Sequence, residues 1–220
     1  MTRNFSGFSR AHLARVIDPV GRALVRAGVS ANLVTVLGAV GVLIGCFGFV
    51  VRGEILAGLV IITVSMLTDM VDGAIARARG SASRFGAFLD STTDRIADGA
   101  VFGSLAYWLA VSGHRVAFAG ALVCLVSGQV VSYAKARAEG LGVRCDVGIA
   151  ERTERLILLG LGGIVYLVGV PYAFEVSLWL LAALSLVTAG QRIVHVRRVA
   201  DAAAAPGEAS ATEPGELTRE

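Results

Sequence analysis

Residues 69–94 read DMVDGAIARARGSASRFGAFLDSTTD and place four carboxylates in a part of the chain that is otherwise apolar. Asp69 and Asp72 are three residues apart, so on a helix they share one face, and Asp90 and Asp94 share a face in the same way. The polar turn over 79–84 predicts that the two helices run antiparallel. We therefore expect the four carboxylates to converge at one end of a helix pair.

The composition places this helix pair in a membrane protein. Of the 220 residues 55% are hydrophobic, and the mean hydropathy is +0.71, far above that of a soluble domain. The first 26 residues contain no continuous apolar core, so no signal peptide is expected. The net charge of +3 in so apolar a chain favours contact with anionic lipid and predicts no nucleic-acid partner.

The predicted fold is an all-α integral membrane protein with six transmembrane helices, preceded by an N-terminal juxtamembrane amphipathic helix within 9–27. The expected spans cover roughly 33–51, 55 into the Asp motif, 85–111, 116–132, 156–170 and 176–193. Three regions follow: 1–29, the cytoplasmic N-terminus with the amphipathic helix; 30–199, the transmembrane catalytic domain; and 200–220, a disordered cytoplasmic tail.

The basic residues predict the orientation. Lys and Arg gather in the N-terminal segment, around the 79–84 turn, in the loop near 135–155 and at the C-terminus, whereas the opposite side carries only Arg52 and Arg115. Both termini and the Asp site are therefore expected on the cytoplasmic side of the cell membrane. Only about 14 positions separate Ile55 from Asp69, fewer than the roughly 20 of a full span, which puts the site in the cytoplasmic half of the bilayer.

Converging carboxylates need cations, because moving several of them out of water costs several kcal/mol each unless they are paired or bind metal. Oxygen ligands with no His or Cys nearby suit Mg²⁺ or Mn²⁺ rather than zinc. A purely structural membrane protein has nothing to offset the four Asp. From a different class of protein, a divalent-cation transporter remains the alternative at this point, because such proteins also carry intramembrane carboxylates.

The motif as a whole is more specific than its carboxylates. Asp69-x-x-Asp72-Gly73-x-x-Ala76-Arg77, eight further residues and Gly86-x-x-x-Asp90-x-x-x-Asp94 resemble, at every fixed position, the signature of the CDP-alcohol phosphatidyltransferase family. The resemblance implies CDP-diacylglycerol as the donor, CMP as a product, two metal ions and a homodimer. It implies metal ligation by Asp69, Asp72 and Asp90, with Asp94 as the general base. A fourth metal ligand is the alternative role for Asp94, and the two roles are compatible.

The donor site follows from the same motif. Small residues on the carboxylate face leave room for a flat ligand, which the resemblance implies is the cytidine, although they would equally allow close helix packing. Arg77 can hold phosphate with its planar guanidinium. Near the first span, two polar residues are expected to face the donor phosphates, with helix capping as the alternative. The predicted donor-binding residues are Asn32, Thr35, Gly73, Ala76, Arg77 and Gly86.

A second basic set lies at helix ends on the predicted cytoplasmic side: Lys135, Arg137, Arg152, Arg155 and Arg192. Membrane anchoring can explain any one of them, but as a group they predict a site for the phosphate of an anionic acceptor. The segments 135–139 and 151–155 resemble those of actinobacterial phosphatidylinositol phosphate synthases, which implies inositol phosphate as the acceptor. Glycerol 3-phosphate, also anionic and used by phosphatidylglycerophosphate synthases, is the alternative.

Overall fold

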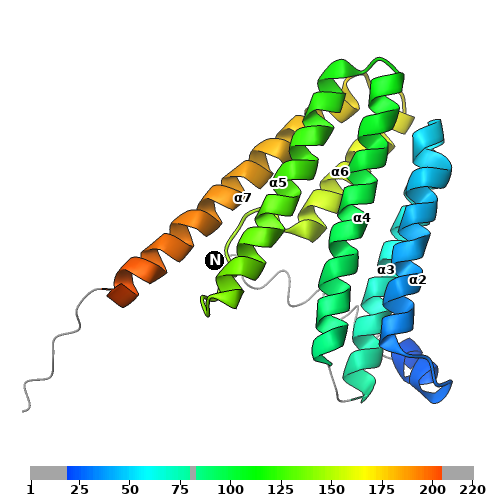
Figure 1. Ribbon diagram of the computed structural model, residues 1–220. Helices are drawn as coiled ribbons and strands as arrows, with labels where there is room; N and C mark the ends of the chain where they lie inside the picture. Colours follow the sequence, from blue (N-terminus) through cyan, green and yellow to red (C-terminus); the bar gives the residue numbers. More distant parts are fainter. Residues whose placement is uncertain (1–18, 80–82, 205–220) are drawn as a thin grey trace, which may run out of the picture.

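A computed structural model of the chain describes residues 19–79 and 83–204, and this part is helical (Figure 1). A helix over 19–26 precedes the labelled elements. These are α2 (Ala31–Ile44), which continues as a π-helical turn (Gly45–Phe49) and a 3₁₀ turn (Val50–Arg52), then α3 (Ile55–Arg79), α4 (Arg84–Val111), α5 (Arg115–Gly140), α6 (Arg152–Leu167) and α7 (Ala173–Ala204).

Four helical segments of the described chain are long and apolar enough to cross a membrane: Ala31–Arg52, Ile55–Ile75, Arg115–Gly140 and Ala173–Ala202. They identify an all-helical protein of the membrane type. Helix α4 has the length of a span, but Asp90, Asp94 and Asp98 keep its first half polar, and α6 has only 16 residues. The count of six spans therefore stays a prediction.

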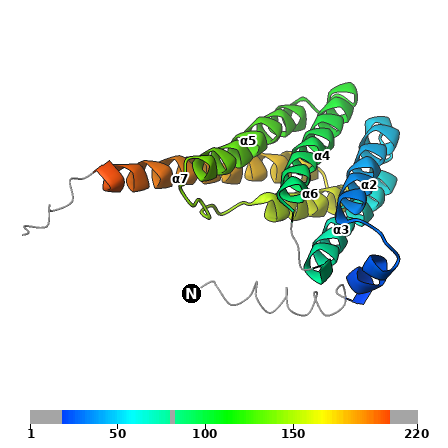
Figure 2. The same ribbon diagram turned by 60° about the horizontal axis from the view of Figure 1, so that its bottom comes forward.

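Helix contacts arrange the bundle as a ring in the order α2, α4, α5, α7, α6 and α3. Figure 2 shows α2 and α3 on one side, α5 and α7 on the other, and α4 and α6 between them. Small residues let neighbours approach closely: a Cβ atom on Gly58 of α3 would lie 2.6 Å from Val50 Cγ2, and one on Gly45 would lie 2.7 Å from Ile62 Cγ1. Glycine is thus required where α2 and its continuation cross α3.

Local capping agrees with the sequence at both ends of the first loop. The Leu33 N–H donates to Ser30 Oγ at 3.2 Å, so Ser30 caps α2 as predicted. Gly28 ends the preceding helix with φ of +79°. Gly21 of that helix is buried against Ala74 of α3, so the described part rests on the end of α3. Residues 9–18 lie outside the described residues, and the amphipathic surface helix stays a prediction.

The core is apolar at the end of the ring away from the Asp motif. There Trp108 packs edge-to-face on Tyr166 and Phe174, with ring centroids 5.6 Å and 5.8 Å apart. On the outside, the side chains of Leu56 and Val64 of α3 are about 60% exposed, as expected for a face in contact with lipid. Polar residues therefore concentrate in the other half of the bundle. Helix α7 continues past the expected start of the tail at 200, and residues 205–220 lie outside the described residues.

Candidate active site

The two helices of the Asp motif meet at one end of the bundle. Helices α3 and α4 run in opposite directions, and the end of α3 lies beside the start of α4, as the sequence predicts (Figure 1). Ser83 caps α4, because its Oγ accepts from the Gly86 N–H at 2.9 Å. This antiparallel arrangement brings the two Asp pairs to the same end.

Helix α2 holds one of the carboxylates in place. Asp72 is buried, and Thr35 Oγ1 donates to Asp72 Oδ2 at 2.5 Å. One turn earlier on α2, Asn32 Oδ1 faces α4, since a Cβ atom on Gly86 would lie 3.2 Å from it. Asn32 and Thr35 thus connect α2 to the two helices of the motif. Their expected role beside the donor phosphates stays a prediction.

The carboxylates of α4 are more open. Asp90 is exposed and Asp94 is half-buried. Among the side chains that the structure describes, no three His, Cys, Asp or Glu residues come together as a metal site. The side chains of Asp69 and Ala76 lie outside the described residues, so the convergence of all four carboxylates stays a prediction. The donor chemistry, carboxylate oxygens with a hydroxyl behind one of them, suits Mg²⁺ or Mn²⁺.

The two glycines of the motif differ in their surroundings. A Cβ atom on Gly86 would lie 3.0 Å from Ser83 Oγ as well as near Asn32, so a side chain here would press on the cap of α4 and on α2. A Cβ atom on Gly73 would lie 3.4 Å from Arg77 Nη1. The guanidinium of Arg77 therefore lies along the Gly73 side of α3, beside a surface that a small residue leaves open.

A cavity of about 860 Å³ opens next to Asp94, between α4, α5, α6 and α7. Its volume is in the range of small-molecule sites. Four of the five basic residues predicted for the acceptor line it: Lys135, Arg152, Arg155 and Arg192. The fifth, Arg137, is exposed and does not line it. The reason is helical geometry, because positions 135 and 137 are two apart and point to different sides of α5.

A partly buried ion-pair network lies in and behind the wall of this cavity. Arg152 Nη1 lies 2.7 Å from Asp94 Oδ1, and Arg152 Nε lies 3.0 Å from Asp98 Oδ1. Arg155 Nη2 lies 2.6 Å from the other oxygen of Asp98. Asp94 Oδ2 is also 3.5 Å from the Arg95 guanidinium. The predicted general base and two of the predicted acceptor residues, Arg152 and Arg155, therefore belong to one network.

The remaining donors of the cavity differ in their partners. Arg155 is 1% exposed, and its Nε and Nη1 have no hydrogen-bond partner in the described part of the chain. Its guanidinium lies against Gly128, where a Cβ atom would collide with it. Arg192 donates to the Val131 and Val147 carbonyls at 2.6 Å and 2.9 Å, which ties α7 to α5 and to the loop before α6. Arg155 is thus a buried and only partly hydrogen-bonded cation at the wall of the cavity.

Lys135, at the cavity edge, is held by the loop between α5 and α6. Its Nζ lies 3.0 Å from Asp146 Oδ1, and Arg144 Nε lies 2.6 Å from Asp146 Oδ2. The hydrogen bonds from Arg144 and Lys135 hold the pKa of Asp146 below its ordinary value. The loop therefore supplies an ionised counterion for one of the predicted acceptor residues.

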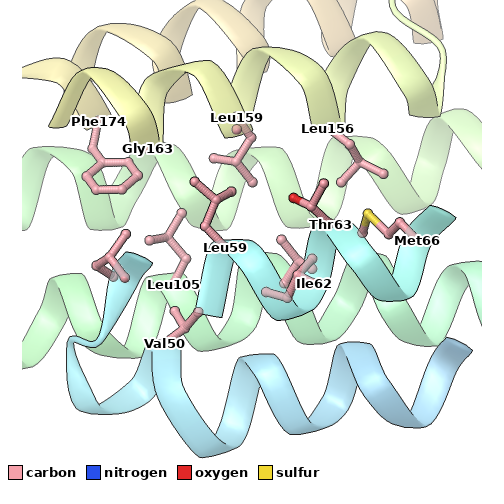
Figure 3. A pocket seen from close by; sticks show the side chains of 13 residues that line it. Val50, Leu59, Ile62, Thr63, Met66, Leu105, Leu156, Leu159, Gly163 and Phe174 are labelled. Carbon is pink, nitrogen blue, oxygen red and sulfur yellow. The ribbon is translucent and has the colours of Figure 1, made fainter. Parts of the chain in front are cut away.

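A second, smaller cavity of about 100 Å³ lies between α3, α4 and α6 (Figure 3). In Figure 3, Leu59 and Ile62 of α3 and Leu159 of α6 point into the space between these helices, and Thr63 supplies the labelled side-chain oxygen. A lining of this kind suits hydrocarbon rather than phosphate. The polar part of a ligand therefore belongs in the larger cavity.

Comparison with protein families identifies the class of protein that carries this site. The chain matches the model of the CDP-alcohol phosphatidyltransferase family over residues 28–190, a stretch that contains the Asp motif and every residue that lines the large cavity except Arg192. The chain belongs to this family. Family membership favours a phosphatidyltransferase over the cation transporter that the carboxylates alone left open.

Relatives within the phosphatidyltransferase family cover most of the chain. The phosphatidylinositol phosphate synthase of Streptomyces avermitilis is 46% identical over 215 residues, which span 92% of this chain and 88% of that protein. The synthase of the same name from Mycobacterium marinum is 44% identical over 192 residues, which span 86% and 82%.

Solved structures agree with this phosphatidyltransferase over nearly their whole length. The crystal structure of Mycobacterium tuberculosis phosphatidylinositol phosphate synthase with CDP-DAG bound has a TM-score of 0.79 at 40% identity, covering 94% of this chain and 98% of that one. The structure of that synthase in complex with manganese and citrate has a TM-score of 0.77, with 93% of each chain covered.

Sequence reasoning missed one buried residue of this phosphatidyltransferase site, Asp98. A signal was present, because Asp98 follows Asp94 by four residues, the spacing that also separates Asp90 from Asp94. Extending the acidic face of α4 by one turn would have found it. Its partners on α6, by contrast, are 54 and 57 residues further along the chain, a distance that helical spacing does not bridge.

Proposed function

We propose that the chain is a membrane phosphatidyltransferase that transfers the phosphatidyl group of CDP-diacylglycerol to a hydroxyl of inositol phosphate and releases CMP. One observation carries the proposal: Asp94 of the family motif and four of the predicted acceptor cations line one cavity of about 860 Å³. The named relatives, which share 44–46% of their residues with this chain, support inositol phosphate as the acceptor. Glycerol 3-phosphate is the acceptor to exclude.

The charge of the cavity supports an anionic acceptor. The lining carries five cationic side chains and three carboxylates: Arg95, Lys135, Arg152, Arg155 and Arg192 with Asp94, Glu139 and Glu151. Behind the lining, Asp98 and Asp146 pair with Arg152, Arg155 and Lys135, so the cations outnumber the carboxylates only at the cavity surface. A phosphate monoester, with about −1.5 to −2 charges at pH 7, would accept charge-assisted hydrogen bonds from these cations, and a free alcohol such as inositol would not.

In the proposed reaction Asp94 takes the proton of the acceptor hydroxyl. The acceptor oxygen forms a bond to the phosphorus of the phosphatidyl group, and the bond from that phosphorus to the CMP phosphate oxygen breaks. Arg152 and Arg95, one on each oxygen of Asp94, orient the carboxylate toward the cavity. Metal ligation by Asp94 is a further role that this arrangement allows.

For the donor side we infer two Mg²⁺ or Mn²⁺ ions held by Asp69, Asp72 and Asp90, with Asp94 adjoining. When bound, the ions would neutralise the diphosphate and stabilise charge on the leaving CMP. The manganese-bound structure of the Mycobacterium tuberculosis relative supports a divalent metal. Thr35 fixes one oxygen of Asp72, which prepares a ligand.

The remaining donor contacts and the setting are proposed from the family motif and the distribution of charge. The cytidine would lie against Gly73 and Ala76, with Gly86 also at the donor site. Asn32, Thr35 and Arg77 would face the phosphates. We further infer a homodimer in the cell membrane with six spans, both termini cytoplasmic and the cavity open to the cytoplasm, because the basic residues collect at that end.

The test is CMP release from CDP-diacylglycerol with inositol phosphate, inositol and glycerol 3-phosphate supplied in parallel. We expect release with inositol phosphate to exceed the other two. A preference for glycerol 3-phosphate would keep the anionic site and replace the acceptor. Equal CMP release with free inositol and with inositol phosphate would show that the basic residues do not bind the phosphate of the acceptor.

A further inference from the structure

We propose that Asp98 is a positioning residue that holds Arg152 and Arg155 in the geometry that selects a phosphorylated acceptor. This inference rests on the proposed function. Asp98 is 3% exposed and lies behind the cavity, whose lining does not include it. It therefore acts on the acceptor only through the two arginines.

The geometry of the carboxylate supports this role. One oxygen of Asp98 binds Arg152 at 3.0 Å and the other binds Arg155 at 2.6 Å, so a single rigid group fixes both side chains. Arg152 and Arg155 are three residues apart on α6, where like charges repel each other. Without a carboxylate between them, the two guanidiniums would spread, and their N–H groups would no longer point to one place.

Burial makes the position of Arg155 depend on this pairing. Its guanidinium is almost fully buried in a space that Gly128 leaves open, and two of its nitrogens lack a hydrogen-bond partner among the described residues. A buried cation needs a nearby counterion, and Asp98 supplies it. Arg155 lines the cavity, so this pairing fixes the position of a buried cation beside the proposed acceptor phosphate. Asp98 thus determines where that cation is held.

Charge alone predicts the opposite effect. Asp98 removes one positive charge from beside an anion site, so its neutralisation should strengthen anion binding if only the net charge mattered. If positioning matters more, the same change should weaken binding. The sign of the change in Asp98→Asn separates the two explanations.

The experiment measures CMP release by the full chain in lipid nanodiscs, with inositol phosphate and CDP-diacylglycerol varied separately. We expect Asp98→Asn to raise the acceptor KM about tenfold or more, the loss of one charge-assisted contact, while the KM for CDP-diacylglycerol stays within about twofold. The preference for inositol phosphate over inositol should fall with it. Glu154→Gln, which removes one exposed acidic charge from α6, is the control and should change neither KM.

A second variant guards against misfolding, since Asp98→Asn leaves buried arginines without this counterion. Asp98→Glu retains the charge but moves the carboxylate by about one carbon–carbon bond, so we expect a raised acceptor KM from geometry alone. An unchanged or lower acceptor KM in the folded variants would overturn the role of Asp98. If Asp98→Asn does not fold, Asp98→Glu decides by the same criterion.

A binding measurement separates this inference from the proposed function. Calorimetric titration of inorganic phosphate into wild type and Asp98→Glu measures the phosphate affinity of the anion site without catalysis. We expect about tenfold weaker binding by the variant. Wild type that binds phosphate but releases no CMP with inositol phosphate would overturn the proposed function. The phosphate affinities would then still decide the role of Asp98, and equal affinities would reject it.

Discussion

At the scale of single residues, the site depends on how its carboxylates are oriented. Asp94 has Arg152 on one oxygen at 2.7 Å and Arg95 on the other at 3.5 Å, so the side chain is fixed before a substrate arrives. Preorganised groups of this kind need little rearrangement during reaction. The same residues also line the large cavity, which places the proposed base beside the acceptor.

The Asp94→Asn variant tests the base. It retains the size of the side chain and one oxygen but cannot take the proton, so we expect kcat to fall by roughly 10²- to 10⁴-fold. CDP-diacylglycerol should still bind, which a binding titration can check independently. Turnover close to wild type would show that another group accepts the proton.

Lys135 and Arg137 form a matched pair on α5. Lys135 lines the cavity, whereas Arg137 is exposed outside it. Lys135→Ala should raise the acceptor KM roughly ten- to a hundredfold, because it removes a charge-assisted contact of about 1.5 to 3 kcal/mol. Arg137→Ala should leave it within about twofold. Equal effects of the two substitutions would point to general attraction of anions rather than a defined site.

At the scale of helices, α2 organises the Asp motif from outside it. Thr35 donates to Asp72 of α3, and Asn32 stands against Gly86 of α4. Glycines where α2 and its π-helical continuation cross α3 bring the backbones close enough for such contacts. The position of Asp72 therefore depends on the packing of a helix that lies outside the motif.

Thr35→Val should expose this dependence. It keeps the shape but removes the hydroxyl from Asp72, and outer contacts to metal ligands commonly change metal affinity 10- to 100-fold. We expect the Mn²⁺ concentration for half-maximal CMP release to rise by about that factor, with activity restored at high Mn²⁺. Thr35→Ser should behave as wild type. EDTA should abolish activity in all three proteins, and Mg²⁺ or Mn²⁺ should restore it.

The glycine crossing can be tested by stability. A Cβ atom on Gly58 would lie 2.6 Å from Val50 Cγ2 and 3.3 Å from the Gly45 carbonyl oxygen, so Gly58→Ala should destabilise by about 1–3 kcal/mol. Gly103→Ala is the control, because a Cβ atom there meets nothing within 4 Å and alanine favours helix. Thermal unfolding in detergent should show a lower Tm for the first variant alone.

At the scale of the whole molecule, the ring of helices has an apolar end and a charged end. The packing of Trp108 on Tyr166 and Phe174 fills one end, and the large cavity with its cationic lining opens at the other. The proposed division of the substrate follows this polarity, with the lipid tails among apolar side chains and the phosphates beside the ion pairs. A reaction between a lipid and a water-soluble alcohol needs both environments in one site.

Cysteine labelling can check the proposed orientation. The three native cysteines, Cys46, Cys124 and Cys145, are buried, so we expect the maleimide to label them little. In intact cells a membrane-impermeant maleimide should label Arg115→Cys and spare Arg197→Cys, both of which replace exposed residues. Inside-out vesicles should reverse the pattern. Labelling of Arg197→Cys from outside would place the C-terminus and the cavity outside the cell.

The sequence alone determined the features that arise from neighbouring residues. Apolar composition predicted a helical membrane protein, the 79–84 turn predicted that α3 and α4 run antiparallel, and Ser30 was correctly expected to open the first span. These features could be predicted because helical periodicity and capping act over a few residues. The family motif could be recognised for the same reason, since its fixed positions lie within 26 consecutive residues.

Only the tertiary structure decided which of the charged residues meet. It brought Asp98 between Arg152 and Arg155, separated from them by 54 and 57 residues, and joined Thr35 to Asp72 across 37 residues. It also left Arg137 outside the cavity that Lys135 lines. Periodicity tells which residues share a face of one helix, but the rotation of each helix against its neighbours is set by side-chain packing around the whole ring.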